Sequence, residues 1–343
     1  MKNEITKAFI SYYDEYKRDL PWRKTKDAYK IWISEIMLQQ TRVEAVKGYY
    51  ERFITTLPTL TSLAEVDDDT LMKLWQGLGY YSRARNLKKC AEICVNEYNG
   101  ELPITYDELV NLPGIGKYTA GAITSIAYNQ RKSAVDGNVM RVFARLFDIH
   151  DNILKEKTKE QFITLVDEYV DDERPGDFNQ SIMDFANDLC IANGTPACEK
   201  CPLKDYCQAY QNNTVMMLPS REKKVSKKEE LHTVIILRYR NEVYLQKRPK
   251  SGLLANMYEF TNFTTALNVE DIEKMFINVE SLRYIGELKN VFSHLIWYIS
   301  VYEVYVNDKP SLDGIWVKEK EIEEVISLPT VMSKIWELTK IRL

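Results

Sequence analysis

The stretch Leu112-Pro113-Gly114-Ile115-Gly116-Lys117-Tyr118-Thr119-Ala120 decides how we interpret the fold. Gly114 and Gly116 allow a tight backbone turn with no side chain in the way. A helix is expected to start at Lys117, and its unpaired N–H groups would form a site for an anion. On its own, the turn fits a phosphate-binding hairpin and an ordinary corner between two helices about equally well.

Length, composition and charge limit the class of protein. A chain of 343 residues, with 45% hydrophobic and 28% charged residues, suggests a globular protein of about two domains. The start of the chain is polar and no apolar run could span a bilayer, so we expect no membrane association and a cytoplasmic, nucleoid-associated protein of a bacterium. We also expect a monomer.

The net charge of −4 argues against generic nucleic-acid binding by bulk attraction. A DNA contact would therefore need a local basic patch, which a few well-placed Lys and Arg side chains can form. The segment from Tyr80 to Lys89 is one candidate for such a patch.

Six cysteines fall into two groups. Cys90 and Cys94 lie one helical turn apart and are expected to be buried thiols. The other four lie close together, which in a cytosolic chain indicates a metal site more often than disulfides. Thiolates suit a four-iron cluster or tetrahedral zinc, and the predicted ligands are Cys190, Cys198, Cys201 and Cys207.

The periodicity of apolar residues changes along the chain. A helical spacing of three and four holds from about residue 4 to 212, with one helix expected from Tyr29 to Val43 and a helix start at Asp67-Asp68-Asp69. Residues 216–230 are charged and indicate a linker. A hairpin around Arg240-Asn241, a strand from Leu295 to Val306 and a closing helix from Pro329 to Ile341 then indicate an α/β domain.

The glycine turn and the segment Val135-Asp136-Gly137-Asn138-Val139 together resemble the helix-hairpin-helix DNA glycosylases, which cut a base from its sugar and carry an essential Asp shortly after the hairpin. The hairpin would lie near residues 107–125. Residues 190–207 resemble the iron–sulfur loop of endonuclease III and its relatives, Cys-x6-Cys-x2-Cys-x5-Cys, with one extra residue in the first gap. This resemblance favours a structural 4Fe-4S cluster over zinc.

Over essentially the whole chain the sequence resembles the adenine DNA glycosylases of the MutY family. The matching segments are Pro21-Trp22-Arg23, Ser34 to Thr41 and Gln76 to Asn86. The resemblance implies an all-α glycosylase domain over residues 1–215 and a Nudix-like lesion-recognition domain over residues 231–343. The substrate would be double-stranded DNA in which adenine is mispaired with 8-oxoguanine or guanine.

Excision of adenine breaks a glycosidic bond through a transition state that resembles an oxocarbenium ion. One carboxyl must protonate the base near neutral pH, and a second must stay ionised beside the sugar. By resemblance, Glu35 is the acid that protonates adenine N7 and later helps to activate water. Asp136 is then the carboxylate that stabilises the sugar cation, and Tyr118 and Asn138 form supporting hydrogen bonds.

Tyr118 occupies the position at which glycosylases that also nick the strand carry a nucleophilic Lys. A phenol cannot form an imine, so the sequence predicts a glycosylase without lyase activity. The neighbouring Lys117 points about a hundred degrees away on a helix and is expected to contact a phosphate, next to Gly114 and Gly116.

A base that is flipped out of the duplex leaves a gap that side chains must fill. By resemblance, Gln40 and Tyr80 wedge into the duplex and Thr41 contacts the orphaned partner base. Arg23, Trp22 and Gln180 would line the adenine pocket, although Trp22 and Tyr80 could also be core aromatics.

The Nudix-like domain should bind rather than catalyse, because no Arg-Glu…Glu-Glu run follows Gly252 to hold magnesium. By resemblance, the loop formed by Phe292, Ser293 and His294 contacts 8-oxoguanine. Two alternatives remain: a related glycosylase with another target base, and a catalytically silent lesion-binding protein. Retention of both Glu35 and Asp136 argues against the second.

Overall fold

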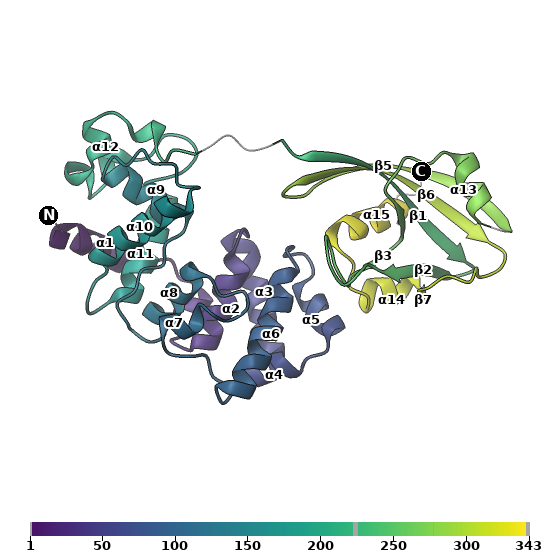
Figure 1. Ribbon diagram of the computed structural model, residues 1–343, viewed down its shortest axis with the longest axis horizontal. Helices are drawn as coiled ribbons and strands as arrows, with labels where there is room; N and C mark the ends of the chain where they lie inside the picture. Colours follow the sequence, from purple (N-terminus) through teal and green to yellow (C-terminus); the bar gives the residue numbers. More distant parts are fainter. Residues whose placement is uncertain (1, 222–225, 277, 341–343) are drawn as a thin grey trace. The chain divides into compact units, whose positions relative to one another are not determined.

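The computed structural model describes residues 2–221, 226–276 and 278–340. The chain divides into two compact units, Met1–Val66 with Arg85–Lys223, and Asp67–Ala84 with Lys224–Leu343. The first unit is helical, and the second contains a mixed sheet with helices (Figure 1). The predicted fold class, a helical part followed by an α/β part, is confirmed. No helix in the described ranges is both long and apolar enough to cross a membrane.

The first unit is built from short helices joined by tight turns. Its elements are α1 (Lys2–Tyr16), η1 (Pro21–Arg23), α2 (Ala28–Leu38), α3 (Val43–Thr56), α4 (Leu60–Glu65), α7 (Tyr106–Leu109), α8 (Lys117–Ile126), α9 (Gly137–Leu146), α10 (Glu156–Tyr169), α11 (Pro175–Asp188), η2 (Cys198–Lys200), η3 (Lys204–Tyr206), α12 (Gln208–Gln211) and η4 (Val215–Met217). Helix α6 (Ser82–Glu97) begins in the second unit and continues into the first.

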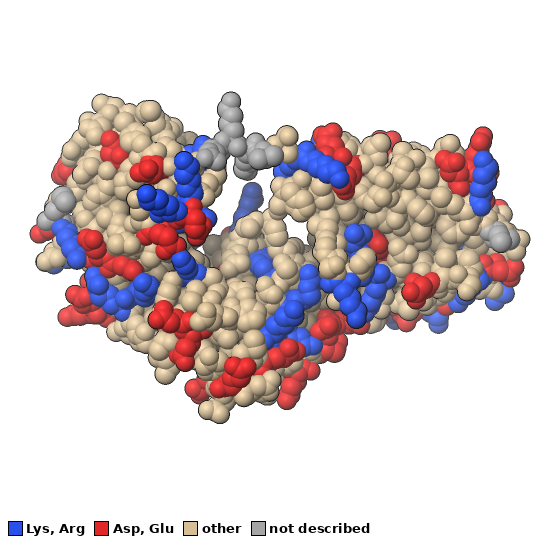
Figure 2. Space-filling view, in the orientation of Figure 1, with Lys and Arg blue, Asp and Glu red and all other residues tan. Residues whose placement is uncertain are grey.

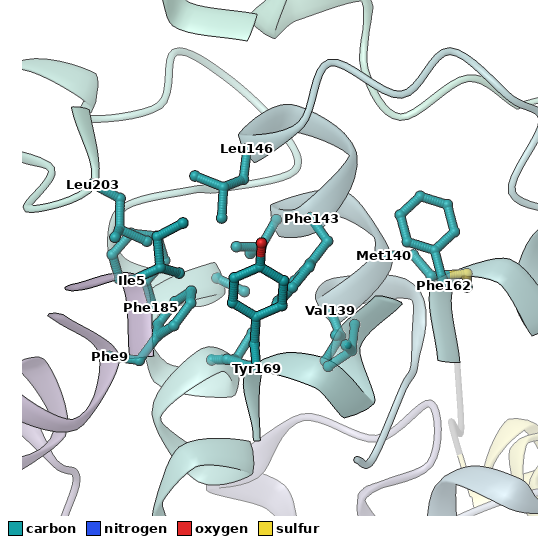
Figure 3. Close-up of a cluster of buried hydrophobic side chains, with 14 of the residues drawn as sticks. Ile5, Phe9, Val139, Met140, Phe143, Leu146, Phe162, Tyr169, Phe185 and Leu203 are labelled. Atoms are coloured by element: carbon teal, nitrogen blue, oxygen red, sulfur yellow. The ribbon is translucent and has the colours of Figure 1, made fainter. Parts of the chain in front are cut away.

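One hydrophobic core of the helical unit forms where α1, α9, α10 and α11 meet (Figure 3). The spacing of Val139, Phe143 and Leu146 turns these side chains of α9 toward one side, where Phe9 of α1 packs edge-on to Phe185 of α11. Burying large aromatic side chains supplies the main driving force for packing. This core fixes α9 and α11, which carry the predicted site residues Asn138 and Gln180.

The single helix predicted from Tyr29 to Val43 is wrong. Helix α2 ends at Leu38 and α3 begins at Val43, because Gln40 between them has a φ of 58°. That left-handed conformation cannot continue a right-handed helix. The break turns Gln40 and Thr41 away from the helix axis and places them on a tight turn.

The sequence signal for a helix start at Asp67 is confirmed. Asp67 is the N-cap of α5 (Asp68–Trp75), and its side chain accepts a hydrogen bond from the Thr70 N–H at 2.8 Å. A carboxylate at this position satisfies an otherwise unpaired backbone donor and interacts favourably with the helix dipole.

The second unit contains a seven-stranded sheet with the main order β3-β2-β1-β6-β5. Its elements after α5 are β1 (Lys228–Tyr239), β2 (Glu242–Lys247), β3 (Tyr258–Glu259), β4 (Thr261–Phe263), α13 (Val269–Met275), β5 (Val279–Val291), β6 (Leu295–Val306), β7 (Ile315–Lys318), α14 (Glu319–Glu324) and α15 (Thr330–Lys340). Strands β1 and β6 are parallel, and β5 and β6 are antiparallel.

The apolar run of β1 is continuous because both faces of this strand are covered. Val234 and Ile236 pack into a core with Ile335 of α15, whereas Ile235 and Leu237 face a second core. Successive side chains of a strand point to opposite faces, so a strand covered on both sides carries apolar residues throughout.

Several predicted boundaries in this unit can be compared with the strands. The hairpin at Arg240-Asn241 is confirmed, with β1 and β2 antiparallel and Tyr239 paired with Glu242. The predicted strand from Leu295 to Val306 coincides with β6, and α15 lies within the predicted closing helix. Strand β1 begins at Lys228, within the segment interpreted as a linker, and residues 222–225 of that segment lie outside the described residues.

Candidate functional site

The glycine turn connects α7 to α8, and α8 starts at Lys117 as predicted. Gly114 has a φ of +77°, and a Cβ atom built there would lie 2.8 Å from the Cβ of Asn86. Gly116, the N-cap of α8, has an ordinary φ of −89°, and no atom lies within 4 Å of a Cβ at that position. Gly114 is therefore needed for the backbone turn, whereas Gly116 leaves open space in front of the helix.

Lys117 lies at the first position of α8 and is exposed. Its Nζ atom forms an ion pair with Glu160 of α10. The first N–H groups of a helix have no partner within the helix, and a Gly N-cap has no side chain to supply one. The start of α8 therefore offers backbone donors to an anion.

Asp136 is the N-cap of α9. Its Oδ1 atom accepts hydrogen bonds from the N–H groups of Asn138 at 2.8 Å and Val139 at 2.9 Å, and its Oδ2 atom accepts from Nδ2 of Asn138 at 2.8 Å. Arg141 in turn donates to Oδ1 of Asn138 at 3.0 Å. Three donors and a helix N-terminus favour the ionised form of the carboxyl and fix its orientation.

Glu35 lies on α2 and is partly exposed in the same cavity as Asp136. The Tyr118 hydroxyl donates a hydrogen bond to Oε2 of Glu35 at 2.8 Å. The hydroxyl links α8 to α2, two helices that pack against each other. The structure thus brings together Glu35, Tyr118, Asp136 and Asn138. About a hundred residues of chain separate the first of these from the last.

The surroundings of the two carboxyls differ. Burial is the main reason that the pKa of Glu35 is raised to about 7; the negative charge of Asp136 adds to the rise, and the Tyr118 hydrogen bond and the charge of Arg23 oppose it. Burial also raises the pKa of Asp136 above its ordinary value, although the N–H groups of Val139 and Asn138 oppose the rise. A carboxyl with a pKa near 7 can donate a proton at neutral pH, while one held by backbone donors can stay charged.

A cavity of about 380 Å³ surrounds these groups. Its volume is within the range of small-molecule sites. The lining side chains come from η1, α2, α3, α8, α9 and α11 and the segments beside them, and are Arg18, Leu20, Trp22, Arg23, Glu35, Leu38, Thr41, Arg42, Val43, Tyr118, Ala122, Ile126, Ala134, Asp136, Asn138, Asn179, Gln180, Met183 and Asn187. Both carboxyls, Glu35 and Asp136, line this cavity.

The three residues predicted to line a base pocket all line this cavity. Trp22 is buried and packs edge-on to Tyr50, so it belongs to the core and to the cavity wall at once. Arg23 lies beside it on η1, and Gln180 lies on α11. A planar indole, a guanidinium and an amide can together contact a purine and its ring nitrogens.

Sequence reasoning missed the acidic partner of Arg23. Asp184 of α11 is fully buried and forms ion pairs with Arg23 and with Arg18, which also lines the cavity. Arg18 and Asp184 are 166 residues apart along the chain. The only sequence signal was the position of Asp184 one helical turn after Gln180, which places both on one side of α11.

Two residues predicted to wedge into DNA have left-handed backbones. Gln40 has a φ of 58° and Tyr80 a φ of 48°, and both side chains are exposed. Non-glycine residues rarely adopt this conformation, and such positions cluster at functional sites. Thr41 follows Gln40 and reaches the cavity.

The loop Phe292-Ser293-His294 connects β5 to β6. Phe292 packs edge-on to Trp297, and its carbonyl accepts a hydrogen bond from Lys227 at 2.6 Å. Ser293 and His294 are exposed. The Ser293 and Tyr80 hydroxyls, which belong to the same compact unit, are 2.8 Å apart.

The four clustered cysteines line one pocket, together with Arg145 of α9. Arg145 donates to the sulfur of Cys190 at 3.3 Å, and Cys207 donates to the Arg145 carbonyl at 3.3 Å. Within the described ranges, no set of three or more His, Cys, Asp and Glu side chains has the arrangement of a metal site. The donor set is nevertheless that of a thiolate-ligated metal or cluster, and Cys90 and Cys94 are separate, buried thiols as predicted.

On the visible face, Lys and Arg are interspersed with Asp and Glu (Figure 2). This distribution agrees with the net charge of −4. Contact with a polyanion therefore depends on particular groups, such as the start of α8, more than on the overall field.

Comparison with known proteins gives consistent results for both units. Residues 33–168 match the HhH-GPD superfamily base excision DNA repair proteins, and residues 232–338 match the NUDIX domain. The chain is 34% identical over 342 residues to the adenine DNA glycosylase of Buchnera aphidicola subsp. Baizongia pistaciae, covering 98% of this chain and 96% of that protein. It is 31% identical to the human adenine DNA glycosylase, covering 96% of this chain and 73% of that protein.

Solved structures agree with the helical fold. A thermostable thymine-DNA glycosylase is 29% identical, with a TM-score of 0.57, and the match covers 62% of this chain and 97% of that one. An endonuclease III–DNA complex shares the fold with a TM-score of 0.52 and 24% identity, covering 62% of this chain and 98% of that one.

Proposed function

The chain belongs to the adenine DNA glycosylases, and from that premise we propose that it removes adenine paired with 8-oxoguanine or guanine and leaves the strand uncut. As a member of this family it is a DNA glycosylase that excises adenine in base excision repair. The observation that carries the proposed mechanism is the cavity that holds Glu35 and Asp136 together in different surroundings.

Glu35 is the general acid in this mechanism. With a pKa raised to about 7, a substantial fraction of its carboxyl is protonated at neutral pH. Transfer of that proton to N7 of adenine lets the base leave with the electron pair of the broken bond between C1′ and N9. The resulting carboxylate then accepts a proton from the water that attacks C1′, which regenerates the acid.

Asp136 stabilises the positive charge that develops on the sugar. Its hydrogen bonds to Asn138 and Val139 hold the carboxylate in place before the reaction starts. A preorganised charge needs no reorganisation when the sugar cation forms, so it lowers the barrier more than a mobile side chain would. Asn138 acts by orienting Asp136, and Tyr118 acts by orienting Glu35.

Among the described residues that line the cavity there is no lysine, which supports base removal without strand cleavage. Tyr118 fills the position beside Glu35, and its phenol cannot form the imine that a lyase requires. Lys117 is next in sequence but pairs with Glu160 and does not line the cavity. We therefore expect an intact abasic site as the product.

We propose that Gln40 and Tyr80 fill the gap left by the flipped adenine and that Thr41 contacts the partner base. The exposed, left-handed positions of the first two support this role. Phe292, Ser293 and His294 would contact 8-oxoguanine, with the hydroxyl and the imidazole as hydrogen-bonding groups. Residues 231–343 would then recognise the lesion and residues 1–215 excise the base, joined by the segment 216–230.

We also propose that Cys190, Cys198, Cys201 and Cys207 bind a 4Fe-4S cluster. The pocket that they share and the Arg145 hydrogen bond to Cys190 support this assignment. The role is structural, because hydrolysis of a glycosidic bond transfers no electrons. Iron and zinc analysis of the purified protein, with its visible absorption spectrum, distinguishes the cluster from the zinc alternative.

A single-turnover assay on labelled duplexes tests the proposed function. Duplexes with adenine opposite 8-oxoguanine, guanine or thymine are incubated with the protein and then split into samples with and without hot alkali. We expect cleavage only after alkali, and only opposite the first two bases. Cleavage without alkali would show lyase activity, release of another base would indicate a related glycosylase, and binding without any product would indicate a lesion-binding protein.

A further inference from the structure

The carboxylate of Asp184 lies just outside the catalytic cavity, behind its wall. Asp184 is on α11 and its side chain is fully buried, whereas Arg18 and Arg23 reach the cavity lining. Asp184 does not line the cavity itself. The ion pairs with these two arginines connect Asp184 to the cavity lining.

The contacts fix the guanidinium of Arg23 tightly. Its two terminal nitrogens donate to the two oxygens of Asp184 at 2.5 and 3.0 Å, a bidentate arrangement. The Arg18 Nε atom donates to Oδ1 of Asp184 at 2.6 Å. The Arg23 guanidinium also lies over the Tyr13 ring, at 5.5 Å from its centroid.

Both partners of the main ion pair are removed from water. The Arg23 side chain is 9% exposed and the Asp184 side chain 0%. A buried charge whose partner is removed is strongly unfavourable, and its field is screened less than that of a surface charge. The charge of Asp184 therefore offsets that of Arg23 at close range.

The positive charge of Arg23 acts on Glu35. It lowers the pKa of Glu35, in opposition to burial and to the charge of Asp136. The other titratable or charged groups that line the same cavity are Tyr118 of α8, Asp136 at the start of α9, Arg18 and Arg42. Arg23 is the cation whose charge lowers the pKa of Glu35.

We propose that Asp184 is a positioning residue for adenine excision, which holds the Arg23 guanidinium in the cavity wall and offsets its positive charge beside Glu35. The inference rests on the proposed role of Glu35 as the acid. Without Asp184, the uncompensated charge of Arg23 favours the ionised form of Glu35, which cannot protonate adenine.

The test is the pH dependence of single-turnover excision of adenine opposite guanine, measured for the wild type, Asp184→Asn, Asp184→Glu and Arg23→Gln. Asp184→Asn should move the midpoint of the alkaline limb to lower pH. At pH values above both midpoints, the rate of Asp184→Asn should be lower than that of the wild type by about tenfold for each pH unit between the two midpoints. At low pH the two rates should become similar. Asp184→Glu keeps the charge and should retain the wild-type midpoint, whereas Arg23→Gln removes the cation and should move the midpoint to higher pH.

Other outcomes distinguish failure of the inference on Asp184 from failure of the proposed role of Glu35. A lower rate of Asp184→Asn at every pH with an unchanged midpoint would indicate a structural role only and overturn the inference. If thermal melting shows that Asp184→Asn does not fold, the Arg23→Gln variant decides: an unchanged midpoint of its alkaline limb would overturn the inference. A wild-type enzyme without an alkaline limb near pH 7 would contradict the proposed role of Glu35 itself.

Discussion

Replacing Gly114 and Gly116 by alanine, one at a time, separates the folding role of the glycine turn from its proposed role in binding DNA. Gly114 has a φ of +77°, and a new Cβ would lie 2.8 Å from the Cβ of Asn86. Gly116 has a φ of −89° and open space around a new Cβ. The two positions are two residues apart in one turn, so each variant serves as the control of the other.

The expected costs differ. For Gly114→Ala, the left-handed backbone costs about 1–2 kcal/mol and the close approach to Asn86 about 1–3 kcal/mol more. A total of about 2–5 kcal/mol lowers the melting temperature of a unit of this size by about 5–20 °C. For Gly116→Ala the loss is about 1 kcal/mol or less, since only the N-cap preference is affected.

Thermal melting and a DNA-binding titration measure the two roles. Gly116→Ala should melt near the wild type but bind duplex DNA at least about tenfold more weakly, because its methyl group occupies the space in which a phosphate would approach the N–H groups of α8. Gly114→Ala should lose stability first. Wild-type DNA affinity in Gly116→Ala would refute the phosphate site, and wild-type melting of Gly114→Ala would refute the argument from backbone strain.

Three other predictions concern the reaction, the lesion and the cluster. Asp136→Asn keeps an N-cap acceptor but loses the negative charge, so the single-turnover rate of excision should fall about a hundredfold or more. DNA affinity, measured in a binding titration, should be unchanged. Loss of both activity and affinity would indicate misfolding instead. Ser293→Ala removes a hydroxyl donor and should lower the ratio of excision rates opposite 8-oxoguanine and guanine by about three- to tenfold, whereas an unchanged ratio would exclude Ser293 from lesion recognition. Cys201→Ser should abolish bound iron and visible absorbance, and Cys90→Ser, outside the proposed ligand set, should keep both; iron retained in Cys201→Ser would contradict the ligand assignment.

The parts of the fold that could be predicted from the sequence depend on local signals. The start of α8 follows from a glycine turn, the cap of α5 from an Asp at its N-terminus, and β6 from a run of β-branched and aromatic residues. Each of these signals acts over a few residues and needs no knowledge of distant packing. Elements of this kind were predicted at or close to their observed bounds.

Other features, such as the break at Gln40 and the ion pairs of Asp184, could not be predicted from the spacing of residue types along the chain. Residues 39–42 are polar but include neither Gly nor Pro, so no helix-breaking residue marks the break at Gln40 in the sequence. The pairing of Asp184 with Arg18 and Arg23 spans more than 160 residues of chain. It places a buried carboxylate behind the cavity wall, which only the packing of α11 against the first elements of the chain reveals.

The central claim is that Glu35 supplies the proton for adenine excision, and the pH dependence of the single-turnover rate tests it most directly. The rate should be high where the carboxyl is protonated and fall as pH rises through about 7, because burial raises the pKa of Glu35 to that value. Glu35→Gln, which keeps the shape of the side chain, should bind the duplex but release no adenine. A rate that stays constant through pH 7, or adenine release by Glu35→Gln at the wild-type rate, would contradict the claim.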